Sequence, residues 1–195
     1  MKIYYIMGKS SSGKDTIFKY LLNDSTLNLT RLVPWTTRPI RFGENDGVDY
    51  NFRTNEEFFK MKEENLIIES REYDTKNGLW IYFTPKENLE EKTYMTIGTL
   101  ESYKAMKNVY GDDLIPIYIQ LEDGIRLQRA LTRELTQSNP KYAEMCRRFL
   151  ADCDDFSEEK LSDCNIDIRF ENNDLEKCVT EIKNFISKNN QERGA

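Results

Sequence analysis

The sequence predicts an α/β fold in which a central parallel β-sheet is flanked by helices, and three observations support this. Apolar strand-like runs alternate with helical stretches along most of the chain. The first apolar run leads directly into a glycine-containing loop and then a helix, the arrangement of a phosphate-binding loop. The length of 195 residues suits one domain with a full core, and no internal repeat is visible.

The elements of this sheet and its flanking layers follow from apolar periodicity. Strands are expected at residues 3–7, 30–33, 94–97, 114–120 and 166–170. Helices are expected at residues 14–22, 100–109, 123–135 and 175–187. Asn173 is the expected N-cap of the last helix, because Glu176 follows it three residues later.

Two stretches depart from this alternation. Residues 36–84 are rich in Arg, Tyr and Gly, which predicts a small inserted subdomain. Its expected elements are a helix near 55–64 and a short strand near 66–69. Residues 133–156 are polar and helical but interrupted at Asn139-Pro140, a pattern that predicts a mobile flap.

The loop after the first strand is suited to polyphosphate. Gly8 and Gly13 let the backbone wrap the anion, while loop N–H groups and the helix N-terminus direct partial positive charge at it. Lys14 adds a full charge for the outer phosphates. The residues expected to bind a nucleotide triphosphate are Gly8, Ser10, Ser11, Ser12, Gly13, Lys14, Asp15 and Thr16. The alternative, an ordinary Gly/Ser loop capping a helix, is disfavoured because strand, loop, lysine and helix are in register.

The composition excludes several classes of chemistry. The chain has no histidine, which removes Ser-His-Asp and Cys-His nucleophiles, His-ligated zinc and imidazole acid–base catalysis. Phosphoryl transfer fits the remaining side chains, because it depends mainly on positioning and charge. The net charge of −6 disfavours a general nucleic-acid partner. No apolar run approaches the roughly 20 residues that span a bilayer, so no membrane partner is expected.

Two further features of composition concern location and surface. The four cysteines form no C-x-x-C pair, and Met1 leads straight into the first strand without room for a signal peptide. We therefore expect reduced thiols and a cytoplasmic location. The acidic stretch 151–176, with ten carboxylates against Lys160 and Arg169, is interpreted as a solvated outer face.

A second cluster of candidate residues lies between Thr36 and Tyr50. Arg38 and Arg41 are three residues apart around Pro39, which favours extended backbone at this point. Guanidinium groups so spaced can converge on one anion, and Arg is well suited to bidentate phosphate contacts. Two glycines in the segment allow turns that bring Glu44 and Tyr50 to the same place. A loop with surface arginines is the alternative, and the neighbouring phosphate loop makes it the weaker one.

The chain resembles the guanylate kinase family in four features. They are the phosphate loop, the segment T-T-R-P-x-R-x-G-E-x-x-G-x-D-Y over 36–50, Glu69 and the stretch 82–87. The resemblance extends in order from Met1 to about residue 186, and the match over 36–50 is its most specific part. It implies a P-loop kinase fold and the reaction ATP + GMP ⇌ ADP + GDP with Mg²⁺, possible also with dGMP.

The resemblance also implies an organisation of the single domain 1–195 into three parts. The core would comprise residues 1–33, 85–128 and 157–188. An acceptor-binding subdomain would occupy 34–84, and a helical lid about 129–156. Residues 189–195 have no apolar anchor, and we expect them to form a frayed tail.

Site residues follow from the resemblance by position. The acceptor (GMP) site would comprise Arg38, Arg41, Glu44, Tyr50, Glu69, Tyr82 and Thr84. Catalytic roles would fall to Lys14, Arg38, Arg133 and Arg148. Glu69 would read guanine, because a carboxylate can accept from both N1–H and the 2-amino group, whereas adenine leaves it unpaired. For Arg126 and Arg147 the expected environment is a solvated helix face with Glu partners.

The chain departs from the family pattern at the metal site. Asp15 stands where Ser or Thr usually offers a hydroxyl to Mg²⁺, and Thr96 and Gly98 replace two carboxylates of a family strand. We hypothesise that Asp15 takes over part of the lost Mg²⁺ role, since a carboxylate is a hard oxygen ligand. Glu101, at the start of the next helix, is a weaker candidate.

The predicted acceptor pocket departs as well. Pro34 replaces a hydroxyl residue that helps to hold guanine, and Trp35 beside it is a candidate to stack on a base. Phe83 replaces a glycine, and the stretch 74–81 is several residues longer than usual. These changes keep two alternatives open: a kinase of another phosphorylated acceptor such as a sugar phosphate, and a catalytically silent binding module. The sequence does not determine the oligomeric state.

Overall fold

The computed structural model describes residues 1–76 and 78–191, and its main feature is a five-stranded parallel sheet. The strand order is β2-β7-β1-β8-β9, so the chain crosses over the sheet between neighbouring strands, as an α/β protein requires. The strands are β1 (Lys2–Met7), β2 (Leu29–Arg31), β7 (Thr93–Ile97), β8 (Leu114–Gln120) and β9 (Arg169–Glu171). The predicted fold class is confirmed.

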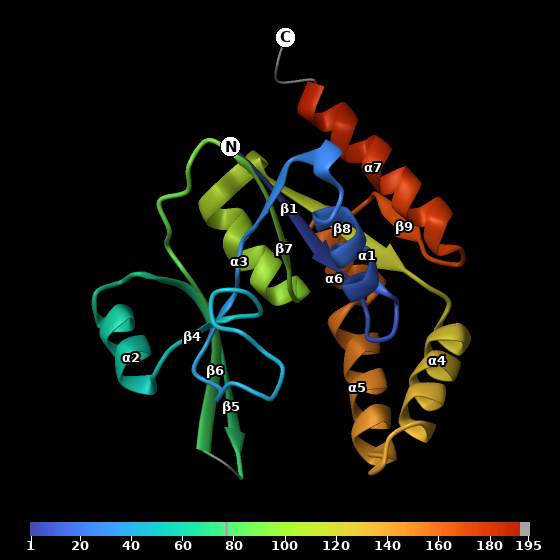
Figure 1. Ribbon diagram of the computed structural model, residues 1–195, viewed down its shortest axis with the longest axis horizontal. Coiled ribbons are helices and arrows are strands. Elements are labelled where there is room, and N and C mark those ends of the chain that lie inside the picture. Colours follow the sequence, from blue (N-terminus) through green and yellow to red (C-terminus); the bar gives the residue numbers. More distant parts are fainter. Residues whose placement is uncertain (77, 192–195) are drawn as a thin grey trace.

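Helices cover both faces of this sheet (Figure 1). One face packs on α1 (Lys14–Leu22) and α7 (Leu175–Gln191), and the other on α3 (Leu100–Tyr110) and α6 (Glu158–Asp163). All six residues of β1 are buried, because alternate side chains such as Tyr4 and Tyr5 enter opposite halves of the core. The carboxyl end of β1, where the phosphate loop begins, is therefore held rigidly between two apolar layers.

A smaller second sheet lies within the predicted acceptor-binding subdomain. Its strand order is β4-β3-β6-β5, and α2 packs beside it through a core of Phe58, Ile81 and Phe83. The elements are β3 (Trp35–Thr36), β4 (Asn51–Phe52), α2 (Asn55–Glu63), β5 (Ile67–Thr75) and β6 (Gly78–Pro85). The capping box Thr54/Glu57 starts α2 where the sequence predicts a helix.

The antiparallel pair β5–β6 corrects one expectation. A short strand was expected near 66–69, but β5 runs on to Thr75 and pairs with β6 as far as Gly78. The outer part of β5 is charged and polar, so periodicity gives little signal there; the ladder to β6 supplies the stabilisation. The long 74–81 stretch therefore forms the far end of an extended hairpin.

Helices α4 (Asp123–Leu135) and α5 (Tyr142–Asp155) run antiparallel to each other and project from the core, across from this hairpin (Figure 1). The break between them contains Asn139-Pro140, as predicted. Helix α5 lies within the predicted lid of about 129–156, and α4 crosses its predicted boundary with the core. The movement and boundaries of the lid stay predictions. Two short 3₁₀ turns, at Ser25–Leu27 and Gly111–Asp113, complete the described elements.

The C-terminal third differs from expectation in three places. Helix α6 was not predicted, and β9 begins at Arg169 rather than at Ile166, which packs into the core instead. Asp174, not Asn173, caps α7, since its carboxylate accepts the N–H of Lys177 at 3.0 Å.

Helix α7 also continues through residues expected to fray. The Tyr4 hydroxyl donates to the side chain of Asn190 at 2.9 Å, and the Lys2 ammonium donates to the Asn189 carbonyl, which anchors this end on β1. Residues 192–195 of the predicted tail lie outside the described residues. Within the described chain, every helix falls short of the length and apolar character that a membrane span requires.

Candidate active site

A cleft of about 900 Å³ lies between the start of α1, the second sheet and α5, and of the predicted nucleotide-binding residues Lys14 and Asp15 line it. Its lining carries seven Lys or Arg residues against four Asp or Glu residues, although the whole chain has a net charge of −6. The basic residues are Lys14, Lys19, Arg31, Arg41, Arg71, Arg147 and Arg148. This local excess of positive charge favours an anionic ligand.

The phosphate loop has the backbone shape that its glycines predict. Gly13 has φ +90°, and a Cβ there would lie 2.2 Å from the side-chain nitrogen of Asn172. Gly8 approaches the Ile119 carbonyl so closely that a Cβ would lie 2.5 Å from its oxygen. The N-terminus of α1 has no side-chain cap, so its first N–H groups stay available for an anion.

Buried polar atoms in the loop point to the same ligand class. Asn172 is buried and donates from its side chain to the Ser12 carbonyl at 2.7 Å, fastening the loop to the end of β9. Within the described residues, the hydroxyls of Ser11 and Ser12 are buried without a hydrogen-bond partner. Since such groups are costly when unpaired, a ligand with many oxygens suits them.

Ser10, whose predicted part in nucleotide binding stays a prediction, also joins the loop to two helices. Its N–H donates to the Asp152 carboxylate of α5 at 2.8 Å, and its carbonyl accepts from Arg126 of α4 at 3.1 Å. The same Arg126 binds Asp123 at 2.6 Å and Asp152 at 3.4 Å and stacks on the Phe149 ring at 4.8 Å. The backbone of the phosphate loop is thus joined to α4 through Arg126 and to α5 through Asp152.

This network overturns two expectations. Arg126 was expected on a solvated face, but its side chain is only 1% exposed because α5 and the phosphate loop cover it. Asp152 begins the stretch interpreted as a solvated acidic face, yet it pairs with a buried guanidinium and a backbone amide. Thr16, by contrast, is exposed and outside the described lining of the cleft.

The predicted phosphate arginines occupy two environments. Arg38 is 2% exposed and binds Glu44 through both guanidinium ends, at 2.8 and 3.0 Å, while its Nε donates to the Tyr82 hydroxyl at 3.0 Å. The hydrogen bond from Arg38 holds the pKa of the Glu44 carboxyl below its ordinary value. Arg41 and Tyr50 line the cleft directly. The structure therefore gathers these residues, with Arg38 behind Glu44 rather than facing the cleft.

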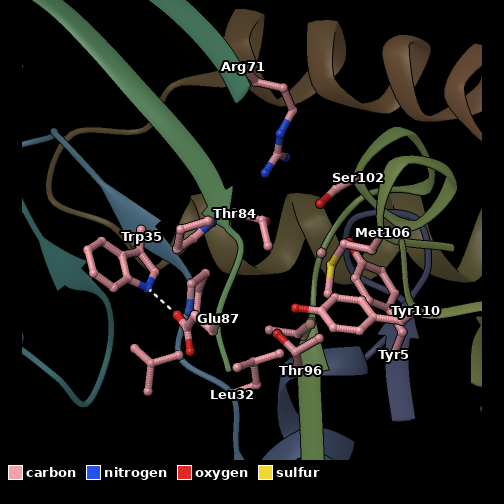
Figure 2. A pocket seen from close by; sticks show the side chains of 15 residues that line it. Tyr5, Leu32, Trp35, Arg71, Thr84, Glu87, Thr96, Ser102, Met106 and Tyr110 are labelled. Atoms are coloured by element: carbon pink, nitrogen blue, oxygen red, sulfur yellow. Dashed lines mark hydrogen bonds between the residues drawn. The ribbon is translucent and has the colours of Figure 1, made fainter. Parts of the chain in front are cut away.

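A narrower recess opens off this cleft (Figure 2). Its volume is about 30 Å³, and it shares five residues with the cleft: Pro34, Trp35, Arg71, Ile97 and Gly98. Thr84, which the resemblance assigns to the acceptor site, lines it together with Pro34 and Trp35, and Thr96 of the predicted metal site lines it as well.

Glu69 lies beside this recess with its carboxylate fully engaged. One oxygen accepts from the hydroxyls of Thr84 at 2.7 Å and Ser102 at 2.9 Å, and the other accepts from Arg71 Nε at 3.3 Å. Its side chain is 8% exposed. Ser102 and Arg71 were not predicted, but Arg71 follows Glu69 by two positions in a strand, which places both on one face.

The structure explains two of the departures from the family pattern, at Gly98 and at Phe83. A Cβ at Gly98 would lie 2.0 Å from the Tyr5 hydroxyl, so Tyr5 occupies the space of the missing carboxylate. Phe83 is buried against Phe58 and Trp35 in the subdomain core. Trp35 lines the recess, but the guanidinium carbon of Arg53 lies over its ring, 4.4 Å from the ring centroid, and the indole N–H donates to Glu87. Stacking of Trp35 on a base stays a prediction.

The predicted lid arginines do not lie together. Arg148 lines the cleft beside Arg147, and both bind Glu144, at 2.8 and 2.7 Å. The hydrogen bond from Arg147, and to a smaller extent the one from Arg148, lowers the pKa of Glu144 to about 2. Glu144 is therefore ionised at neutral pH, and both of its ion pairs persist. Arg147 is 66% exposed, as expected. Arg133 is exposed on α4 and outside the described lining of the cleft.

The carboxylates available to a metal are few. Among the described residues, no group of three or more His, Cys, Asp or Glu side chains could hold a metal ion. Asp15 lines the cleft, 79% exposed and 3.8 Å from the Lys14 ammonium. Glu101 lines a different pocket, with Lys104 and Asp163. Asp15 is therefore the better placed of the two predicted candidates.

Comparison with known proteins places this site in context. A family model for guanylate kinase matches residues 1–189. The guanylate kinase of Mycoplasma mobile is 31% identical over 195 residues, which cover 96% of this chain and 92% of that protein. The guanylate kinase of Mycoplasmoides gallisepticum is 30% identical (97% and 93% covered), and that of Porphyromonas gingivalis is 29% identical (95% and 96% covered).

The fold also matches a solved structure. The crystal structure of guanylate kinase from Anaplasma phagocytophilum superimposes with a TM-score of 0.60 at 23% identity, covering 96% of this chain and 86% of that one. At 23% identity this likeness supports the fold alone, and the assignment to the family rests on the matches in sequence.

Proposed function

Because the chain belongs to the guanylate kinase family, whose members phosphorylate GMP to GDP with ATP, we propose residue roles for this reaction in its cleft. ATP is held by the phosphate loop, with its outer phosphates on Lys14 and on the N-terminal amides of α1. The observation that carries the proposal is a basic cleft that contains both Lys14, at the end of this loop, and the acceptor residue Arg41, in a chain of net charge −6. The buried hydroxyls of Ser11 and Ser12 add polar groups that suit phosphate oxygens.

The acceptor phosphate is held by Arg41, Tyr50 and Tyr82, which line the cleft opposite Lys14. Arg38 supports them through Tyr82 and Glu44, and it reaches the phosphate only if Glu44 releases it. Glu69 accepts from guanine N1–H and the 2-amino group. The hydroxyls of Thr84 and Ser102 can rotate to share its oxygens with the base.

In the transfer, an oxygen of the GMP phosphate attacks the γ-phosphorus and the bond to the β-phosphate oxygen breaks, which leaves ADP. Charge on the moving group is neutralised by Lys14 and, when α5 approaches, by Arg148. Arg147 stands beside Arg148 on the cleft and is a further candidate. Arg133 takes part only if the lid moves. Approach of the lid also excludes water that would hydrolyse ATP.

Mg²⁺ bound with ATP would neutralise the phosphates, and the side chains present suit it. Mg²⁺ in kinases often takes one or two carboxylates together with substrate phosphates and water. Asp15, exposed in the cleft next to Lys14, offers such a carboxylate. The cytoplasmic location, the lack of nucleic-acid partners and the mobile lid stay predictions.

Removing the Asp15 carboxylate tests its metal role. We expect Asp15→Asn to raise the Mg²⁺ concentration needed for half-maximal ATP affinity by roughly 10-fold, as loss of metal-site groups commonly does. Calorimetric titration of ATP at several Mg²⁺ concentrations measures this without turnover. Asp49→Asn, which removes another carboxylate of the same cleft, is the matched control. An unchanged Mg²⁺ dependence in Asp15→Asn rules the role out.

An acceptor panel tests the function itself. ADP release is followed with GMP, dGMP, AMP, CMP, UMP and phosphorylated sugars. We expect GMP to be preferred over AMP by about 10²-fold or more in kcat/KM, because adenine lacks the N1–H and 2-amino donors that guanine offers to Glu69. Phosphorylation of a sugar phosphate without GMP turnover would establish the alternative acceptor. ATP binding without any turnover would establish a silent module.

A further inference from the structure

Among the described residues that line the recess, Arg71 carries the one cationic side chain (Figure 2). It extends from β5 and points down between Thr84 on one side and Ser102 on the other. It also lines the large cleft, so its guanidinium stands where the recess meets the nucleotide-sized space. The Glu69 carboxylate lies directly beside it, since it accepts from Arg71 Nε at 3.3 Å.

The donors of Arg71 are only partly used. A guanidinium carries five N–H groups. Within the described structure, Nε donates to Glu69 at 3.3 Å and Nη1 donates to the Thr99 hydroxyl at 3.3 Å. Both contacts are long for charge-assisted hydrogen bonds, whose usual length is about 2.7–2.9 Å. The remaining N–H groups can therefore serve a ligand while Nε keeps its contact with Glu69.

Guanine presents two kinds of polar group along one edge. N1–H and the 2-amino group are donors, which a carboxylate satisfies, and O6 beside them is an acceptor. Pro34 cannot donate to O6 from its side chain or its backbone nitrogen. Thr84 and Ser102 already donate to Glu69. Among the described residues that line the recess, Arg71 is the cationic one, and it has N–H groups to spare for O6.

We propose that Arg71 is a specificity-determining residue that donates to guanine O6 while Glu69 accepts from N1–H and the 2-amino group. The inference rests on the proposed function, because it assumes that the acceptor base enters this recess. Arg71 and Glu69 together would thus recognise an acceptor and donors on the same edge of the base. Adenine reverses the pattern, since its 6-amino group would face the guanidinium and its N1 would face the carboxylate.

A single-atom change in the substrate tests the assignment. In 6-thio-GMP, sulfur replaces O6 and accepts hydrogen bonds weakly, while N1–H and the 2-amino group remain. We expect the wild-type protein to prefer GMP over 6-thio-GMP by roughly 10- to 100-fold in kcat/KM, the effect of one charge-assisted hydrogen bond. In Arg71→Ala this preference falls to within about 3-fold, mainly through a larger KM for GMP. Arg71→Lys keeps a donor and retains part of the preference.

Ser102→Ala is the matched control, because it removes another donor to Glu69 and leaves the guanidinium of Arg71 in place. If Arg71 acted only by orienting Glu69, Arg71→Ala and Ser102→Ala would both weaken the two nucleotides in equal proportion. An unchanged GMP to 6-thio-GMP ratio in Arg71→Ala therefore overturns the assignment while the GMP kinase activity stands. Absence of GMP turnover in the wild-type protein overturns the proposed function and this inference with it. Calorimetric binding of both nucleotides, with a thermal melt of each variant, separates a lost contact from a misfolded protein.

Discussion

Lys14→Ala is expected to lower kcat for phosphoryl transfer by at least about 10²-fold. The loss of one preorganised electrostatic donor at a developing charge typically costs 10²–10³ in rate. Lys14 carries the full positive charge that lies next to the uncapped N-terminus of α1, within the cleft. Its side chain is 21% exposed and its ion-pair partner is the exposed Asp15, so its removal leaves the core intact. ADP release in the presence of GMP measures the effect.

The control is Lys177→Ala, which removes a 77% exposed lysine from α7, away from the cleft. We expect this variant to keep wild-type turnover. Thermal melts of both variants should coincide with that of the wild-type protein. A Lys14→Ala protein that is folded and retains turnover within about 3-fold would show that the outer phosphates are held by other groups.

Asp152→Ala is expected to destabilise the fold by about 2–4 kcal/mol. It removes one carboxylate from a guanidinium that is 1% exposed, and it leaves the Ser10 N–H without its acceptor. Hydrogen bonds to charged groups contribute about 1.5–3 kcal/mol, and breaking a buried ion pair costs about 3–5 kcal/mol. Asp123 remains as a partner of Arg126, which keeps the expected cost below the upper end of that range. Urea or thermal unfolding measures it.

The same variant should weaken ATP binding, since Ser10 belongs to the phosphate loop. Asp154→Ala is the matched control on α5, because the Asp154 carboxylate is 80% exposed and its ion-pair partner, Lys160, also lies at the surface. We expect a change within about 1 kcal/mol there. If Asp152→Ala unfolds like Asp154→Ala, the network around Arg126 does not stabilise the loop, and the lid helices are not coupled to it through this contact.

Much of the site could be predicted because its parts are local. The phosphate loop follows from consecutive residues: an apolar strand, two glycines, a lysine and a helix. Arg38, Glu44 and Tyr50 lie within one short segment, and the structure brings them together. Arg71 could have been found by the same kind of reasoning, because residues two apart in a strand share a face. The expected strand near 66–69 stopped before it, so the signal was missed.

The contacts between distant segments could not be predicted. The helical spacing of Arg126 indicates which face of α4 it occupies, but not that α5 and the phosphate loop cover that face. Asn172 holds the loop from 160 residues away. Tyr5 fills the space at Gly98 across two neighbouring strands, a relationship visible only once β1 and β7 are paired.

By itself, the sequence determined the strand–loop–helix unit, the layered α/β class and the chemistry left open by the absence of histidine. Each of these depends on composition or on residues within a few turns of one another. The tertiary structure decided which charged side chains are buried, which carboxylate the base meets and which helices are joined to the phosphate loop. The physical reason is that periodicity assigns a side chain to a face, whereas its burial and charge partners depend on which distant element packs against that face.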